Sequence, residues 1–250
     1  MSSDIRVWKK EFAELLKLPI IIFRNGLIHT IQYETGDYKI RMSIWNKKLE
    51  LWDAWESWRT VGDKIILHRN PYIGPAAIKY YESGQILSKE YWVNDERHRP
   101  LEEGPACVYY FRNDQIEHEV YCVNGIPYRP SKEGPNSIIY YPNGKIRKER
   151  YYNKYDILHR PTDEGPAYIS YYKNGNIKKI SYFINGELHR SDGPAVIRYN
   201  KHYQITHEGY WFNATKHRPI KDGPAYIDYD KNGKITYDEY WVDGVEIFDI

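Results

Sequence analysis

The segment HRPTDEGPAYISYYKNG, residues 159–175, holds a histidine, an arginine and two carboxylates within six positions, followed by Gly-Pro and a run of tyrosines. Taken alone, such a cluster has the composition of an acid/base or metal site. The same pattern recurs at intervals of 28 to 31 residues, however, and six copies fill residues 68–250. A catalytic site is normally built once, so this recurrence indicates a structural role in an array of repeats.

The six copies share one order of residues. Each passes from a His-Arg or Tyr-Arg pair through Gly-Pro to an Ile/Val-x-Tyr segment, a turn, an isoleucine and an aromatic residue. The predicted repeats are residues 68–97, 98–127, 128–158, 159–188, 189–216 and 217–250. Two strand-like segments joined by a turn predict a β-hairpin, so we expect an all-β, elongated array of antiparallel hairpins of about 30 residues, arranged as a meander or solenoid.

The turn segment YPNGKI, residues 141–146, sets the register of the hairpin. Pro142 suits a type I turn and Gly144 suits a left-handed residue, which together predict a type I turn with a G1 bulge. In that register Tyr140 faces Ile146. If side chains alternate strictly between the two faces from this pair onward, the face of every other residue in the hairpin follows.

Two faces follow from that alternation. The core face is expected to collect the alanine after Gly-Pro, the Ile/Val and Tyr of the first strand, the isoleucine after the turn and the aromatic residue that ends the second strand. The opposite, wet face is expected to carry Lys79, Ser170, Arg198 and Asp228 with Glu149, Glu208 and Asp238, and also a tyrosine column. Cys107 is expected on the wet face and Cys122 on the core face, which argues against a disulfide.

The His-Arg segments are expected to be the corners between hairpins. An acid precedes Gly-Pro in five of the six copies, and an arginine fork can satisfy loop carbonyls and that carboxylate together. The predicted structural corner residues are His68, Arg69, His98, Arg99, Arg129, His159, Arg160, His189, Arg190, His217 and Arg218. A row of corner histidines does not predict a metal site, because adjacent hairpins of a meander are two strands, about 9–10 Å, apart.

The N-terminal quarter does not show the repeat. Residues 1–18 are expected to hold a helix, and residues 19–67 a degenerate repeat or cap that begins with a strand pair turning at Asn25-Gly26. The segment LELWDAWESW has tryptophans at every third position, which suits neither a clean strand nor a straight helical stripe. Capping the array is the first interpretation of this region, and a docking surface rich in tryptophan is the second.

Composition and motifs count against several classes of function. Lys and Arg number 36 against 34 Asp and Glu, so no large basic excess indicates nucleic acid or an anionic membrane. The two cysteines fit no metal spacing, and no long apolar run or signal-peptide core occurs, so we expect an intracellular protein with no transmembrane segment. No nucleophile elbow or phosphate loop is present, so we expect neither an enzyme, nor a cofactor, nor a small-molecule substrate.

The pattern NGELHRSDGPAVIRY at residues 185–199, together with YYKNGNIKK, resembles the MORN-variant repeats of bacteria. In its His-Arg…Gly-Pro-Ala form it is similar to repeat proteins abundant in large DNA viruses of amoebae. The resemblance covers residues 68–250. It implies a hairpin array used for binding or scaffolding, in a viral structural or virion-associated protein of the virion or host cytoplasm, and it implies no catalytic residue.

Two functions remain open. The first is a protein-interaction or structural scaffold, with a protein partner or a second copy of the chain; its candidate partner-binding residues are Trp52, Trp55, Trp58, Tyr91, Tyr121, Tyr151, Tyr182, Tyr210 and Tyr240. The alternative is nucleic-acid binding by the arginine and tyrosine surface, with a local basic stretch at Lys145, Arg147, Lys148, Arg150, Lys178 and Lys179. Positions that break the repeat, such as Cys122, Asn136 and Tyr203, are further places to look for an interaction site.

Overall fold

The computed structural model describes the backbone of residues 21–25, 28–35, 38–46, 51–61, 64–81 and 83–248, with side chains from Leu67 onward. The chain has two compact units, Met1–Asp114 and Gln115–Ile250, which we describe separately. The predicted helix at residues 1–18 lies outside the described residues. No helix in the described part of the chain is long and apolar enough to cross a membrane.

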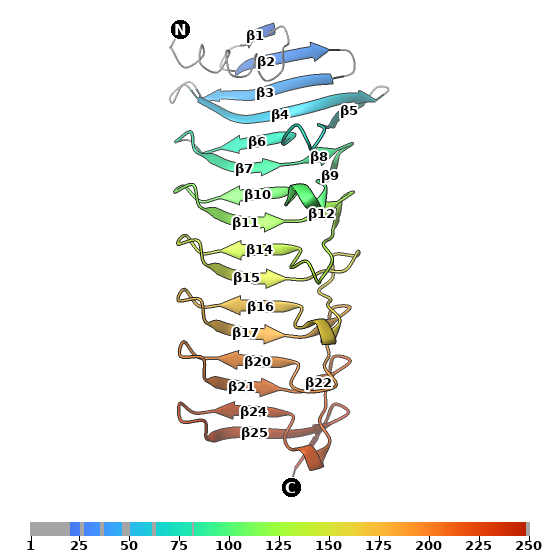
Figure 1. Ribbon diagram of the computed structural model, residues 1–250, viewed down its shortest axis with the longest axis vertical. Coiled ribbons are helices and arrows are strands. Elements are labelled where there is room, and N and C mark those ends of the chain that lie inside the picture. The colour runs from blue at the N-terminus through green and yellow to red at the C-terminus, as the bar shows by residue number, and fades with distance from the viewer. Residues whose placement is uncertain are drawn as a thin grey trace. The chain divides into compact units, whose positions relative to one another are not determined.

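The first unit contains one antiparallel meander. Its strands are β1 (Ile21–Asn25), β2 (Ile28–Thr35), β3 (Tyr38–Asn46), β4 (Leu51–Val61), β5 (Lys64–Leu67), β6 (Ala77–Tyr80), β7 (Ile86–Glu90) and β10 (Cys107–Tyr110), with the short pair β8 (Trp92–Val93) and β9 (Glu96–Arg97). Strand β1 pairs with β2, as the Asn25-Gly26 turn predicts. From β2 the ladder continues through β3, β4, β6 and β7 to β10 (Figure 1).

The tryptophan-rich segment is a strand. Trp52, Trp55 and Trp58 all lie on β4, which pairs with β3 from Leu51 to Arg59. The interpretation that this spacing suits neither strand nor helix is therefore wrong. The backbone hydrogen bonds with β3 hold this segment in the strand conformation, and the spacing of its tryptophans does not indicate that pairing.

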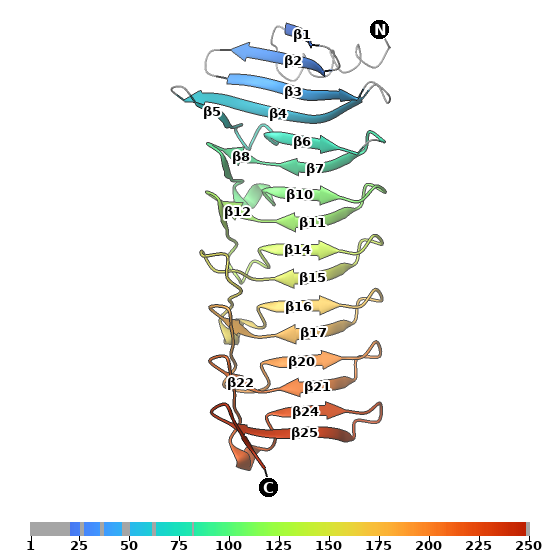
Figure 2. The ribbon, with the colours of Figure 1, turned by 180° about the vertical axis from the view of Figure 1, so that it is seen from behind.

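The second unit begins with β11 (Ile116–Val120), which pairs with β14, and then repeats one hairpin four times. Its main strands are β14 (Ser137–Tyr140), β15 (Ile146–Arg150), β16 (Tyr168–Tyr171), β17 (Ile177–Ser181), β20 (Val196–Tyr199), β21 (Ile205–Gly209), β24 (Tyr226–Tyr229), β25 (Ile235–Val242) and β26 (Val245–Ile247). Short pairs join β12 (Cys122–Val123) to β13 (Ile126–Pro127), β18 (Phe183–Ile184) to β19 (Glu187–Leu188), and β22 (Trp211–Phe212) to β23 (Thr215–Lys216). In Figures 1 and 2 the tight turns of these hairpins lie along one side and the corners with the short pairs along the other.

The turn of the hairpin follows the prediction. Tyr140 pairs with Ile146, the Tyr141 N–H donates to the Lys145 carbonyl at 2.8 Å, and Gly144 has φ 78°. Only a residue without a Cβ adopts that φ at no steric cost. The antiparallel hairpin array predicted from the sequence is confirmed within each unit.

The predicted faces need a correction. Beyond Tyr140 and Ile146 the next pair is Ile139 with Lys148, so the second strand contains one extra residue, Arg147. A bulge of one residue reverses the alternation that follows it, so Glu149 lies opposite Ile138 on the core face and not on the wet face. The same shift occurs in the hairpins β6–β7, β16–β17, β20–β21 and β24–β25.

Burial confirms part of the predicted core and corrects the rest. The alanines after Gly-Pro are at most 1% exposed; they are Ala76, Ala106, Ala167, Ala195 and Ala225. The face expected to be wet is also buried near the corners, because Cys107 is 0% and Ser137 4% exposed. The tyrosine column was also expected on the wet face, but it follows the bulge and lies on the core face, where Tyr151 is 7% exposed and its N–H donates to the carbonyl of Ala167. Both cysteines are buried.

Candidate functional site

The corner arginines bind the backbone of their own corners. In every corner an arginine Nη1 donates to the carbonyl of the proline in the next Gly-Pro, at 2.9–3.5 Å; the six are Arg69, Arg99, Arg129, Arg160, Arg190 and Arg218. The expected carboxylate partner is found where Arg190 meets Asp192 at 2.8 Å. In another corner Glu164 instead accepts a hydrogen bond from Ser131 of the preceding corner.

The predicted tyrosine column supports these arginines. Each guanidinium carbon lies 3.9–4.2 Å from the ring centroid of the tyrosine that directly follows a main strand; the pairs are Arg99–Tyr91, Arg129–Tyr121, Arg160–Tyr151, Arg190–Tyr182 and Arg218–Tyr210. The stacked face of each ring is thus occupied within the array. A partner-binding role for this tyrosine column, Tyr240 included, stays a prediction. The same role stays a prediction for Trp52, Trp55 and Trp58, because their side chains lie outside the described part of the chain.

The corner histidines are hydrogen-bond acceptors. Nδ1 of His68, His159, His189 and His217 accepts a backbone N–H about one repeat further along, at 3.1–3.3 Å. This contact ties a corner to the short strand pair of the following hairpin. Among the residues whose side chains are described, no group of three or more His, Cys, Asp or Glu is placed to hold a metal ion.

The positions that break the repeat differ in exposure. Cys122 and Asn136 are buried, and Asn136 Oδ1 accepts the Tyr152 N–H at 2.7 Å, so both serve packing. Tyr203 is 55% exposed at a turn with φ 66° and stacks on Tyr199 at 4.9 Å. These departures therefore do not gather into one surface.

A second cluster forms a site that the repeat pattern did not reveal. A hollow of about 560 Å³ in the second unit is lined by five cations, five tyrosines and two hydroxyl residues; they are Tyr141, Arg147, Lys148, Tyr168, Ser170, Tyr171, Tyr172, Lys178, Lys179, Arg198, Tyr199 and Thr206. We call it the basic groove. No carboxylate is among its twelve lining residues.

Strand register builds the centre of the basic groove. Lys148 pairs with Ser170, Ser170 with Lys179, and Lys179 with Arg198, on the adjacent strands β15, β16, β17 and β20. Directly paired residues of antiparallel strands point to the same face. Three cations and one serine therefore form a continuous row across four strands.

The cations of the row are not paired with acidic side chains. In the part of the chain whose side chains are described, none of Lys148, Lys179 and Arg198 has a carboxylate within ion-pair distance. Burial, together with Arg150, Arg147 and Lys178, lowers the pKa of Lys148. Burial and Arg198 lower the pKa of Lys179. Like charges placed opposite each other destabilise a sheet, so this row costs the free protein stability.

Other repeats carry an acid where the groove has none. In the first repeat, Glu90 lies 3.1 Å from Lys79 on the same face. In the sixth, Glu239 lies 2.9 Å from Lys216. The same repeat position is occupied by Arg150, Ser181 and Gly209 in the third, fourth and fifth repeats. The row of Lys148, Lys179 and Arg198 therefore lies in repeats that have no acid at this position.

The tyrosines of the groove place aromatic rings beside its cations. Arg147 lies 5.8 Å from the Tyr141 ring, Lys178 5.6 Å from Tyr172, and Lys179 5.9 Å from Tyr168. The hydroxyls of Tyr141 and Tyr172 donate to backbone carbonyls of the next hairpin at 2.8 Å, which fixes both side chains. The groove is thus a rigid surface of positive charge and aromatic rings.

The comparison with protein families bears on the array. Three segments, residues 76–94, 136–154 and 167–185, match the family described as MORN repeat variant. The predicted resemblance to MORN-variant repeats is confirmed. No curated protein matches the chain. The matches suggest a protein-interaction or structural repeat module, and two of them contribute residues to the basic groove.

The basic stretch could be predicted from the sequence, but the groove could not. Arg147, Lys148, Lys178 and Lys179 belong to that stretch, whereas Arg198 was expected only as a residue of the wet face. The signal that was available is the loss of the acid at the position of Glu90 and Glu239 in the middle repeats.

Proposed function

We propose that this chain is a non-enzymatic interaction module: a rigid array of MORN-variant hairpins that presents the basic groove to an anionic macromolecule. One observation carries the proposal, namely the row Lys148–Ser170–Lys179–Arg198, which concentrates charge without any carboxylate to balance it. A module that only scaffolds its own fold has no need for this row, since it lowers stability.

The recurrent corner residues support the same division of roles. Their arginines, histidines and tyrosines are engaged with one another and with the backbone, so they form the frame. The groove cations are turned outward from that frame: Arg147, Lys178 and Arg198 are exposed. We therefore assign the interaction to the middle repeats and the frame to the corners.

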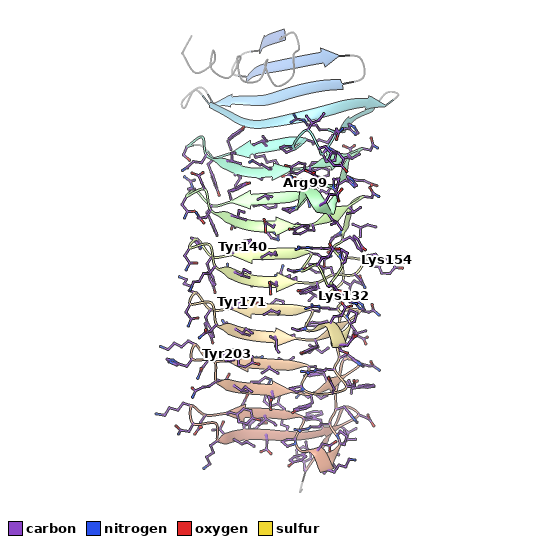
Figure 3. All side chains as sticks on the ribbon, in the orientation of Figure 1. Arg99, Lys132, Tyr140, Lys154, Tyr171 and Tyr203 are labelled. Carbon is purple, nitrogen blue, oxygen red and sulfur yellow. The ribbon has the colours of Figure 1, made fainter. Side chains whose placement is uncertain are left out.

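The test compares two variants that lose the same charge. Lys148→Ala with Lys179→Ala removes two cations from the groove, and Lys132→Ala with Lys154→Ala removes two exposed cations from the corner side (Figure 3). On immobilised heparin, used as a generic polyanion, we expect the groove variant to elute at clearly lower salt than the control variant. Equal elution of the two variants contradicts the proposal.

A further inference from the structure

We infer that the basic groove binds single-stranded nucleic acid with little preference for sequence. This inference rests on the proposed function and names the class of its ligand. It is carried by three features of the groove: the direction of its cation row, the aromatic rings beside that row, and the kinds of polar side chain it lacks.

The cation row is linear. Lys148, Lys179 and Arg198 lie on β15, β17 and β20, and adjacent strands are about 4.8 Å apart, so the row extends over about 14 Å. A single compact anion needs cations that converge on one point. A row fits a chain of regularly spaced negative charges, as a phosphate backbone provides.

Aromatic rings line the same face. Tyr168 lies directly beside the row, because Tyr168 and Ser170 alternate on β16 and so share a face. Tyr141 and Tyr172 lie at the turn end of the groove. A base of a single strand can stack on such rings, whereas the bases of a duplex are already stacked on one another. An acidic peptide has no group that uses the rings in this way.

The groove lacks the amide and carboxylate side chains that read bases. Asn and Gln read adenine, and Asp and Glu read cytosine, whereas Arg147 and Arg198 can contact phosphates as well as base edges. The twelve lining residues contain no Asn, Gln, Asp or Glu, and the neutral hydrogen-bonding groups apart from tyrosine are Ser170 and Thr206. We therefore expect binding through phosphates and base faces, with similar affinity for different sequences.

Variants for the test are taken from the array itself. Tyr168→Val introduces the residue that the fifth repeat has at this position, Val196, and leaves every groove cation in place. Tyr226→Val makes the same change in the sixth repeat, outside the groove, and is the matched control. Lys179→Ser introduces the residue of the first repeat, Ser88. Circular dichroism establishes that each variant is folded.

The experiment is fluorescence anisotropy of the full chain with a labelled oligothymidylate, an RNA of equal length, the corresponding duplex, and polyglutamate. We expect both single strands to bind more tightly than the duplex and polyglutamate, and their affinity to fall as salt rises. We expect Tyr168→Val to weaken single-strand binding by about tenfold, and Tyr226→Val to leave it unchanged.

Other outcomes separate this inference from the proposed function. If polyglutamate or the duplex binds as tightly as the single strands, or if Tyr168→Val binds like the unaltered chain, the inference is overturned while an anion-binding module stands. If Lys179→Ser has no effect on any of the four probes, the inference and the proposed function both fail.

Discussion

Arg160 lies over the ring of Tyr151, with its guanidinium carbon 4.0 Å from the ring centroid, and its Nη1 donates to the carbonyl of Pro166. A Cβ on Gly165, which has φ 120°, would lie 3.0 Å from that same Nη1. Glycine at this position thus provides both the backbone conformation and the space for the arginine. One guanidinium links the strand that ends a repeat to the strand that begins the next.

Replacing this arginine is therefore expected to destabilise the array. Arg160→Lys keeps the charge but loses the planar fork, so it loses the donor to Pro166 and most of the stacking. We expect the free energy of unfolding in urea to fall by about 2 kcal/mol. The equivalent change Arg129→Lys should cost a similar amount, because Arg129 stacks on Tyr121 at 4.2 Å. A cost within ±0.5 kcal/mol of zero for both variants would show that the corners are not structural.

Buried tyrosines make the fold sensitive to alkali. Burial raises the pKa of Tyr80 to about 12. Burial and the hydrogen bond to Glu119 at 2.6 Å raise the pKa of Tyr140. A folded-state pKa above the unfolded value of about 10 gives stability that is fully present below pH 10 and lost as the pH rises through the folded value.

Removing the hydroxyl of Tyr140 tests this pH dependence. Tyr140→Phe keeps the ring but leaves Glu119 without this donor, so we expect a loss on the order of 1 kcal/mol at pH 8. Above pH 10 the difference between the variant and the unaltered chain should shrink. Urea unfolding at several pH values, with tyrosinate absorbance as the second readout, measures both. A difference that grows with pH would contradict the assignment.

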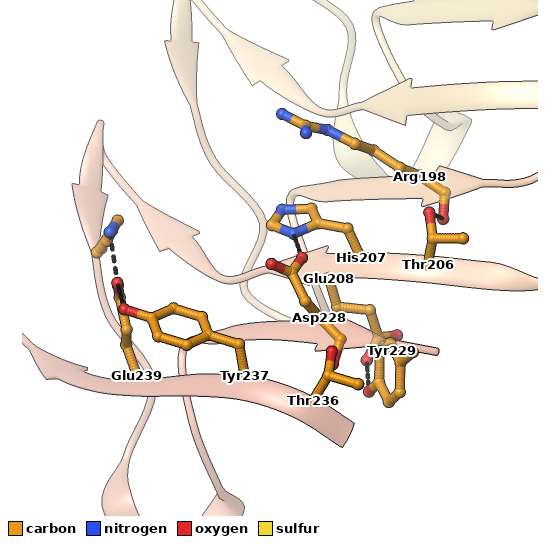
Figure 4. A network of polar contacts seen from close by, with 10 residues as sticks. Arg198, Thr206, His207, Glu208, Asp228, Tyr229, Thr236, Tyr237 and Glu239 are labelled. Carbon is orange, nitrogen blue, oxygen red and sulfur yellow. Dashed lines mark hydrogen bonds and ion pairs between the residues drawn. The ribbon is translucent and has the colours of Figure 1, made fainter. Parts of the chain in front are cut away.

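His207 makes the fold sensitive to acid. Its Nδ1 lies 2.8 Å from Asp228 Oδ1 (Figure 4). Its ring lies edge-on to the ring of Tyr226. Burial lowers the pKa of His207, aided by Arg198 and Lys179, and outweighs the opposing effect of Asp228. At neutral pH we therefore expect a neutral imidazole whose Nδ1–H donates to the Asp228 carboxylate.

A depressed folded-state pKa gives stability that is present above the unfolded value of about 6.5 and lost as the pH falls through the folded value. We expect the melting temperature to fall as the pH drops from 7 towards 5, and His207→Ser, which introduces the residue of the first repeat, to flatten that dependence. Nuclear magnetic resonance titration of the His207 ring provides the direct check. A midpoint at or above 6.5 would reverse the predicted slope.

We expect the groove cations to lower the stability of the free protein while they increase its affinity for a ligand. Lys179 lies opposite Arg198 on the neighbouring strand, so removing its charge relieves repulsion. We expect Lys179→Ser to raise the free energy of unfolding by on the order of 0.5 kcal/mol, about 1–2 °C in melting temperature. Lys216→Ser should do the opposite, because Lys216 pairs with Glu239 at 2.9 Å. If both substitutions destabilise equally, the row is not strained and the argument for a ligand loses its basis.

The hairpin array and the turn at Gly144 could be predicted from the sequence, because each depends on local spacing or on recurrence. The bulge at Arg147 could not, since an alternating pattern carries no mark of one extra residue, and that residue moved Glu149 to the other face. The groove was hidden for a related reason. Lys148, Lys179 and Arg198 are 31 and 19 positions apart, and only the strand register brings them together.

The central claim is that the middle repeats bind through the groove and not through the corners. Photo-cross-linking of the full chain to an oligothymidylate that carries 4-thiothymidine, followed by mass spectrometry of the peptides, tests it most directly. We predict cross-links at Tyr141, Tyr168 and Tyr172, which are lost when salt is raised. Cross-links at the corner tyrosines Tyr151 and Tyr182, or spread evenly over the repeats, would contradict the account.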